Sequence, residues 1–170
     1  MRGPLYIPTM ADSVYIESSV VSYLVARASR DLITAGRQAI TAEWWQNQRC
    51  RFDVYVSALV IEELGAGDRS AAELRLQAVA DVPSLAVGPE AETLAEVLLS
   101  DGAVPSNSPR DALHIAIAAA HGTDYLLTWN FRHINNAETR RHVVRVVADH
   151  GLVCPTLCSP EELGGRVDDE

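Results

Sequence analysis

Lysine is absent from the 170-residue sequence, so all 14 of its basic residues are arginines. The 23 acidic residues outnumber them, and the formal net charge of −9 argues against non-specific binding of long nucleic acids through overall charge. A nucleic-acid substrate is not excluded, because arginines beside an acidic metal site contact phosphates locally. An acidic chain is also suited to a basic protein partner.

Long apolar runs are absent as well. No window approaches the roughly 18 apolar residues of a membrane span, and Met1–Pro4 lacks the apolar region of a secretory signal. Only three cysteines occur, Cys50, Cys154 and Cys158, and they lack zinc-finger spacing. We therefore expect a cytoplasmic protein with reduced thiols, although Cys154 and Cys158 are close enough in sequence to pair. A glycine-rich phosphate loop is also missing, which weighs against nucleotide binding.

The size and composition of the chain, 48% hydrophobic and 22% charged, predict one compact domain with a full core. We assign residues 13–163 to this domain, residues 1–12 to an irregular N-terminal extension and residues 164–170 to an acidic tail. Because Met10 comes just before the first predicted strand, translation starting at either Met1 or Met10 is compatible with this division.

Apolar segments with strand-like and helix-like patterns alternate along the chain, which predicts an α/β fold with a mainly parallel sheet of about five strands. The expected strands are residues 13–16, 54–56, 85–87, 125–128 and 154–157. The expected helices are residues 18–26, 31–48, 57–64, 71–80, 90–100, 111–121 and 136–150. Proline in the last strand predicts a position at the edge of the sheet.

Four polar residues fall where such a sheet assembles a site, at strand ends and in helices beside that edge: Glu17, Glu63, Asp111 and Asn130. Each has an ordinary structural alternative, such as a helix cap for Glu17 or a turn for Asn130. Their motifs contain no basic partner, so three carboxylates and one amide together indicate a divalent cation and a metal-dependent hydrolase.

Four segments carry a more specific signal: Tyr15–Leu24, Val56–Leu64, Asp111–Ala116 and Leu126–Asn130. In order and register they resemble the PIN domain, and most closely the VapC-type toxins of prokaryotic toxin–antitoxin pairs. The resemblance extends from Val14 to about Leu163. It implies a single-domain, three-layer α/β/α sandwich whose acidic pocket binds Mg²⁺ or Mn²⁺ and cuts RNA. It also implies a homodimer and an antitoxin partner that inserts a segment into or near the pocket.

The resemblance carries the four site residues over with two departures. Glu17 stands where the family usually has aspartate, and Asn130 stands where aspartate is common, so we expect one firm metal site rather than two. Glu17 and Asp111 are expected to hold the metal, with Glu63 and Asn130 binding directly or through water. Glu63 or Asp111 is the expected general base for the attacking water.

Residues close to these four in sequence are candidates for contact with the substrate. Ser18 is expected to orient a phosphate or a water, and Arg110 or Arg132 to steer the RNA backbone. His114, one helical turn after Asp111, is geometrically able to join a metal, but a histidine in so apolar a helix is more often buried and hydrogen-bonded. Of Trp44 and Trp45, one is expected in the core and the other at a partly exposed interface.

Two other classes of protein remain open from the sequence. With Glu17 and Asn130 both off the family pattern, the chain is also compatible with a noncatalytic RNA-binding or protein-binding module on the same scaffold. A phosphatase normally carries an Asp-x-Asp pair at the first strand, and Glu17-Ser18-Ser19 offers no such pair. The phosphatase is therefore the least favoured class.

Overall fold

The computed structural model describes residues 10–165. Residues 1–9 of the expected extension and residues 166–170 of the expected tail lie outside the described residues. The described chain forms a five-stranded sheet in which every neighbouring pair of strands is parallel, in the order β3-β2-β1-β4-β5. The strands are β1 (Ser13–Ile16), β2 (Asp53–Ser57), β3 (Ser84–Leu85), β4 (Tyr125–Leu127) and β5 (Thr156–Cys158).

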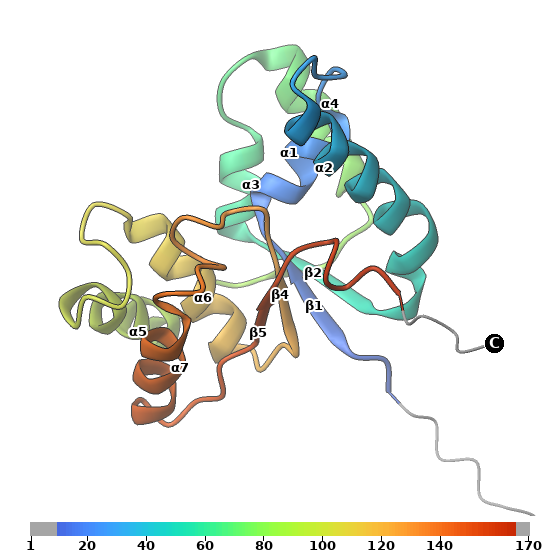
Figure 1. Ribbon diagram of the computed structural model, residues 1–170. Helices are drawn as coiled ribbons and strands as arrows, with labels where there is room; N and C mark the ends of the chain where they lie inside the picture. Colours follow the sequence, from blue (N-terminus) through green and yellow to red (C-terminus); the bar gives the residue numbers. More distant parts are fainter. Residues whose placement is uncertain (1–9, 166–170) are drawn as a thin grey trace, which may run out of the picture.

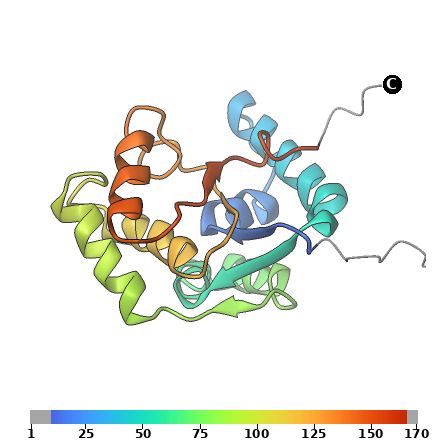
Figure 2. The same cartoon turned by 90° about the horizontal axis from the view of Figure 1, so that it is seen from below.

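Two layers of helices cover this sheet (Figure 1), and the view turned by 90° in Figure 2 separates them again. Helices α1 to α4 form one layer and α5 to α7 the other, which gives the predicted three-layer sandwich. The helices are α1 (Ser18–Val25), α2 (Leu32–Glu43), α3 (Ala58–Leu64), α4 (Arg69–Ala78), α5 (Pro89–Ser100), α6 (Pro109–Ala120) and α7 (Arg140–Asp149). No helix within residues 10–165 is both long and apolar enough to span a membrane.

The strand order reverses beside β1, and this reversal fixes where a site can form. The chain runs from β1 to β2 and β3 in one direction, and then returns to the other side of β1 with β4 and β5. The connections after β1 and β4 therefore lead into opposite layers, and in open α/β sheets the carboxyl ends of two such strands are where a binding crevice is expected. Glu17 directly follows β1, and Asn130 lies three residues after β4.

Local sequence explains most element boundaries. The Ser57 hydroxyl accepts a hydrogen bond from the Val60 amide at 3.2 Å and caps α3, as predicted. Pro89 and Pro109 begin α5 and α6, where a missing N–H costs nothing. The long helix predicted to reach about Gln48 does so, but its last turn, Trp44–Gln48, is a π-helix rather than an α-helix.

Three predicted boundaries are wrong by a few residues. The last strand begins at Thr156 rather than at residue 154, because Pro155 has no N–H for the ladder. It is an edge strand, as predicted. The last helix begins at Arg140 because the Asn136 side chain accepts from the Glu138 amide and forms a turn first. The third strand, expected at 85–87, is the two-residue pair Ser84–Leu85.

The core lies on both faces of the central strand. Val14, Tyr15 and Ile16 are fully buried, and the predicted apolar helix α6 buries seven of its residues. Trp44 is fully buried against Phe52, which confirms a core position for one of the two tryptophans, and Trp45 is half-buried. All three cysteines are free thiols, as expected.

Candidate metal centre

Glu17 caps helix α1 and at the same time points its carboxylate into the crevice. Oε1 accepts from the Ser18 hydroxyl at 2.7 Å and from the Ser19 amide at 3.1 Å. Oε2 accepts from the Thr128 hydroxyl at 2.7 Å and from the Ser19 hydroxyl. The residue is only 5% exposed, so these hydroxyls replace water around a buried charge. The cap that sequence reasoning offered as an alternative therefore coexists with a place in the site.

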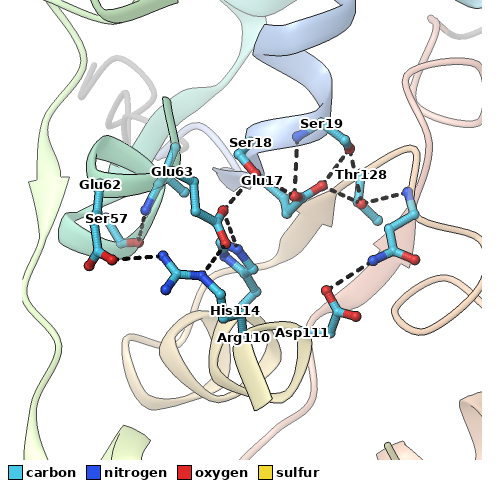
Figure 3. A network of polar contacts seen from close by, with 12 residues as sticks. Glu17, Ser18, Ser19, Ser57, Glu62, Glu63, Arg110, Asp111, His114 and Thr128 are labelled. Atoms are coloured by element: carbon cyan, nitrogen blue, oxygen red, sulfur yellow. Dashed lines mark hydrogen bonds and ion pairs between the residues drawn. The ribbon is translucent and has the colours of Figure 1, made fainter. Parts of the chain in front are cut away.

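Glu63 lies in the last turn of α3, and its carboxylate faces Glu17 across Ser18 (Figure 3). Oε1 accepts from Arg110 Nε at 2.9 Å, and Oε2 accepts from the Ser18 hydroxyl at 2.6 Å and from His114 Nε2 at 2.9 Å. Burial alone raises the pKa of Glu63, but the hydrogen bonds from His114, Ser18 and Arg110 outweigh it and lower the pKa to about 2. Glu63 is therefore ionised at neutral pH.

Glu62, the neighbouring acid, turns away from the crevice. Its side chain is 70% exposed and pairs with Arg110 Nη2 at 3.1 Å. The two adjacent glutamates are thus the same residue type on the same helix but lie in different environments. Glu62 is for that reason a matched control for substitutions at Glu63.

Ser18 joins the buried Glu17 to the partly buried Glu63. Its hydroxyl oxygen lies 2.7 Å from Glu17 Oε1 and 2.6 Å from Glu63 Oε2. A hydroxyl has a single proton and donates it to one carboxylate at a time. Ser18 therefore holds Glu17 and Glu63 close together without neutralising their two negative charges.

His114 adds a nitrogen to this group. The side chain is 1% exposed, and its Nδ1 lies 2.7 Å from the Tyr15 hydroxyl, which in turn lies 2.8 Å from the Ser57 hydroxyl. Burial raises the pKa of Tyr15, so the phenol stays neutral and both donates and accepts in this chain. His114 is buried and hydrogen-bonded, as the sequence favoured, yet its Nε2 also faces the acids.

Asp111 lies one turn before His114 on α6 and has different partners. Oδ1 accepts from the Asn130 amide nitrogen at 3.0 Å, and Oδ2 lies 2.8 Å from His133 Nδ1. Asn130 Oδ1 accepts from the backbone amides of Arg132 and His133 at 3.2 and 3.0 Å. Asn130 therefore forms the turn and presents its nitrogen, rather than its oxygen, to Asp111.

The expectation that the acids lack basic partners is wrong. Arg110 and His114 contact Glu63, and His133 contacts Asp111. Sequence motifs miss these pairs because they join residues between 22 and 51 positions apart. No motif spacing in the sequence indicated that His133 belongs near the site. The available signal was its position three residues after Asn130, in the turn that Asn130 starts. Arg110, expected to steer RNA, is engaged by Glu62 and Glu63, whereas Arg132 is exposed and has no ion pair within residues 10–165.

The donor atoms fit a divalent cation. One ligand atom from each of Glu17, Glu63 and His114 lies within 4.8 Å of the other two. Two carboxylates and an imidazole are ordinary ligands for a divalent metal, and the hydroxyls of Ser18, Ser19 and Thr128 fix the orientation of both carboxylates. This group combines the residue that follows β1 with residues of α3 and α6, which only the fold brings together.

The fold and this acidic crevice define a known class of protein. The family model "PIN domain" matches residues 14–138, and the chain belongs to the PIN domain family. PIN domains are generally nucleases that use divalent metal ions.

Among the solved structures that match is the crystal structure of VapBC2 from Rickettsia felis bound to a DNA fragment from their promoter. The TM-score is 0.51 at 13% sequence identity, over 86% of this chain and 98% of that chain, so the likeness concerns the fold. No curated protein sequence matches this chain significantly.

Proposed function

We propose that this protein is a metal-dependent endoribonuclease that hydrolyses RNA phosphodiester bonds, and that it is the toxin of a toxin–antitoxin pair. The observation that carries the proposal is the convergence of Glu17, Glu63 and His114 in the crevice of a PIN domain. Arg110 and His114 balance part of the negative charge through Glu63, whereas Glu17 forms no ion pair within residues 10–165, so a divalent ion would compensate the charge that remains.

Glu17 and Glu63 would hold Mg²⁺ or Mn²⁺, with Asp111 or His114 completing the set. When bound, such an ion supplies positive charge to the scissile phosphate and lowers the pKa of water at the site. We assign Asn130 to the orientation of Asp111 rather than to the metal, because its oxygen is taken up by two backbone amides.

Glu63 and Asp111 have different roles in this proposal. Because the pKa of Glu63 is about 2, its carboxylate is a weak base and suits a metal ligand better than a proton acceptor. Asp111 has a partly exposed carboxylate held in place by Asn130 and His133, and it takes the proton of the attacking water. Ser18 orients the two glutamates, and the exposed Arg132 contacts the RNA backbone.

The partner assignments follow the solved relative only by analogy. That structure contains a VapBC2 complex on promoter DNA. We propose a corresponding antitoxin for this chain, a homodimeric assembly and a cytoplasmic location. The chain's net charge of −9 favours a basic segment as the part of the antitoxin that reaches the acidic crevice.

Cleavage of a panel of structured RNAs with Mg²⁺, Mn²⁺ or EDTA tests the activity. We expect cutting with metal, none with EDTA, and a loss of at least about 100-fold in Asp111→Asn, since removal of a general base typically costs this much. Failure of the wild-type protein to cut any RNA while it binds metal would favour a noncatalytic RNA-binding or protein-binding module.

A further inference from the structure

On the α2 side of the metal centre, the guanidinium of Arg37 lies over two aromatic rings. Its Cζ is 5.5 Å from the ring centroid of Trp129 and 5.1 Å from that of Phe131. Thr41, four residues later on the same face of α2, accepts a hydrogen bond from Trp129 Nε1 at 2.8 Å. The arrangement therefore fixes Arg37 against the segment that follows β4.

Arg37 has no close anionic partner among residues 10–165, although its charge adds to the hydrogen bonds from Thr34 that lower the pKa of Asp31 at the start of α2. Within residues 10–165 no carboxylate forms an ion pair with it, and its guanidinium makes no hydrogen bond. This is unusual for a half-buried arginine in a chain with 23 acidic residues. The two rings pack against the guanidinium of Arg37, and its N–H groups donate no hydrogen bond within residues 10–165.

The two rings border the proposed catalytic acids. The Trp129 amide donates to the Ser19 hydroxyl at 2.9 Å, and that hydroxyl contacts Glu17. Asn130, between the two aromatic residues, contacts Asp111. Trp129 is 5% exposed, whereas Phe131 is 39% exposed and offers ring surface to a ligand. Arg132, the next residue, adds a second exposed cation.

We infer that Arg37 and Phe131 form a subsite for a nucleotide next to the scissile phosphate of single-stranded RNA. The inference rests on the proposed function. The Arg37 guanidinium donates to a phosphate oxygen, and a base stacks on the exposed part of the Phe131 ring. The planar guanidinium of Arg37 suits a phosphate, and the exposed ring of Phe131 suits a base. Phe131 directly follows Asn130, which contacts Asp111, so both groups of the nucleotide would lie beside the proposed catalytic acid.

The test is RNA binding measured apart from cleavage. Asp111→Asn protein is titrated into a fluorescent single-stranded RNA of mixed sequence, and anisotropy is recorded at several salt concentrations. Arg37→Met keeps apolar packing on the rings and removes the charge, and Phe131→Leu removes the stacking face. Arg145→Met is the control, because Arg145 is exposed on α7 and has no ion pair in the described chain.

We expect Arg37→Met to weaken RNA binding about tenfold and to reduce the slope of log affinity against log salt by about 0.7, the value for one phosphate contact. Phe131→Leu weakens binding about tenfold with an unchanged slope, and Arg145→Met changes neither. Wild-type affinity in Arg37→Met, or a weaker affinity with the full salt slope, would overturn the inference and leave Arg37 as a packing contact. Cleavage by the wild type is scored separately, so a failed subsite and a failed nuclease give different results.

Discussion

The Tyr15 hydroxyl lies 2.7 Å from Nδ1 of His114, and both side chains are buried. The contact joins the central strand to α6 across 99 residues of sequence. It holds the imidazole so that Nε2 faces Glu63 at 2.9 Å. A buried phenol thus orients a group at the candidate metal centre without belonging to the Glu17, Glu63 and His114 cluster itself.

Tyr15→Phe is expected to lower both stability and metal affinity. It leaves the Ser57 hydroxyl and His114 Nδ1 without their partner, which costs about 1–3 kcal/mol in the free energy of unfolding. Loss of the orienting hydrogen bond lowers Mn²⁺ affinity about tenfold. Urea unfolding and calorimetric titration measure the two effects. Tyr55→Phe, on β2 and without a side-chain hydrogen bond among the described residues, is the control and should change neither.

Asn130→Asp, which restores the common family residue, should make stability depend on metal. The substitution places a carboxylate where an amide nitrogen now lies 3.0 Å from Asp111 Oδ1, and two carboxylates at this distance repel each other. We expect a lower melting temperature than wild type in EDTA and a larger rise on adding Mn²⁺. Asn130→Ala removes the amide without adding charge. An equal response to Mn²⁺ in the two variants would argue against a cation beside Asp111.

Glu63 should make stability fall at acid pH. Its pKa is lowered in the folded protein from 4.5 to about 2, so the stabilisation is present above pH 4.5 and is lost as the pH falls toward 2. Urea unfolding at pH 5 and pH 3 should show a smaller loss in Glu63→Gln than in wild type. Glu62→Gln, an exposed neighbour, should follow the wild type. Identical pH profiles of all three proteins would show that Glu63 is not specially stabilised.

The three thiols should react at very different rates. Cys50 is exposed, whereas burial raises the pKa of Cys154 to about 11 and that of Cys158 to about 12. A maleimide at neutral pH should label Cys50 quickly and the other two only after unfolding in urea. Mass spectrometry counts the labels. A single label after unfolding would reveal a disulfide between Cys154 and Cys158.

The sequence predicted those parts of the fold that local chemistry determines. The apolar runs of β1 and α6 and the Ser57 cap follow from patterns within a few residues of one another, and the edge position of β5 follows from Pro155. The closeness of Glu17 and Glu63 was expected because parallel strands end at a common edge. Asp111 was expected beside them, but it contacts Asn130 and His133, and His114 is the third residue of the cluster.

The remaining details depend on contacts between distant segments. The partners of Asp111 and Glu63 come from the turn after Asn130 and from α6, and no spacing in the sequence encodes them. The orientation of the Asn130 amide is likewise set by two backbone amides that only the folded turn supplies. His114 was singled out from its position one turn after Asp111, but its contact with Glu63 depends on the fold, which brings side chains of α3 and α6 together from opposite layers.

Binding of Mn²⁺ to the purified protein, measured by isothermal titration calorimetry, tests the account most directly. We predict one ion per chain, an affinity at least about tenfold weaker in Glu63→Gln, and an unchanged affinity in Glu62→Gln. No binding of Mn²⁺ or Mg²⁺ by the wild-type protein, or equal affinities in the two glutamate variants, would contradict a metal centre built on Glu63.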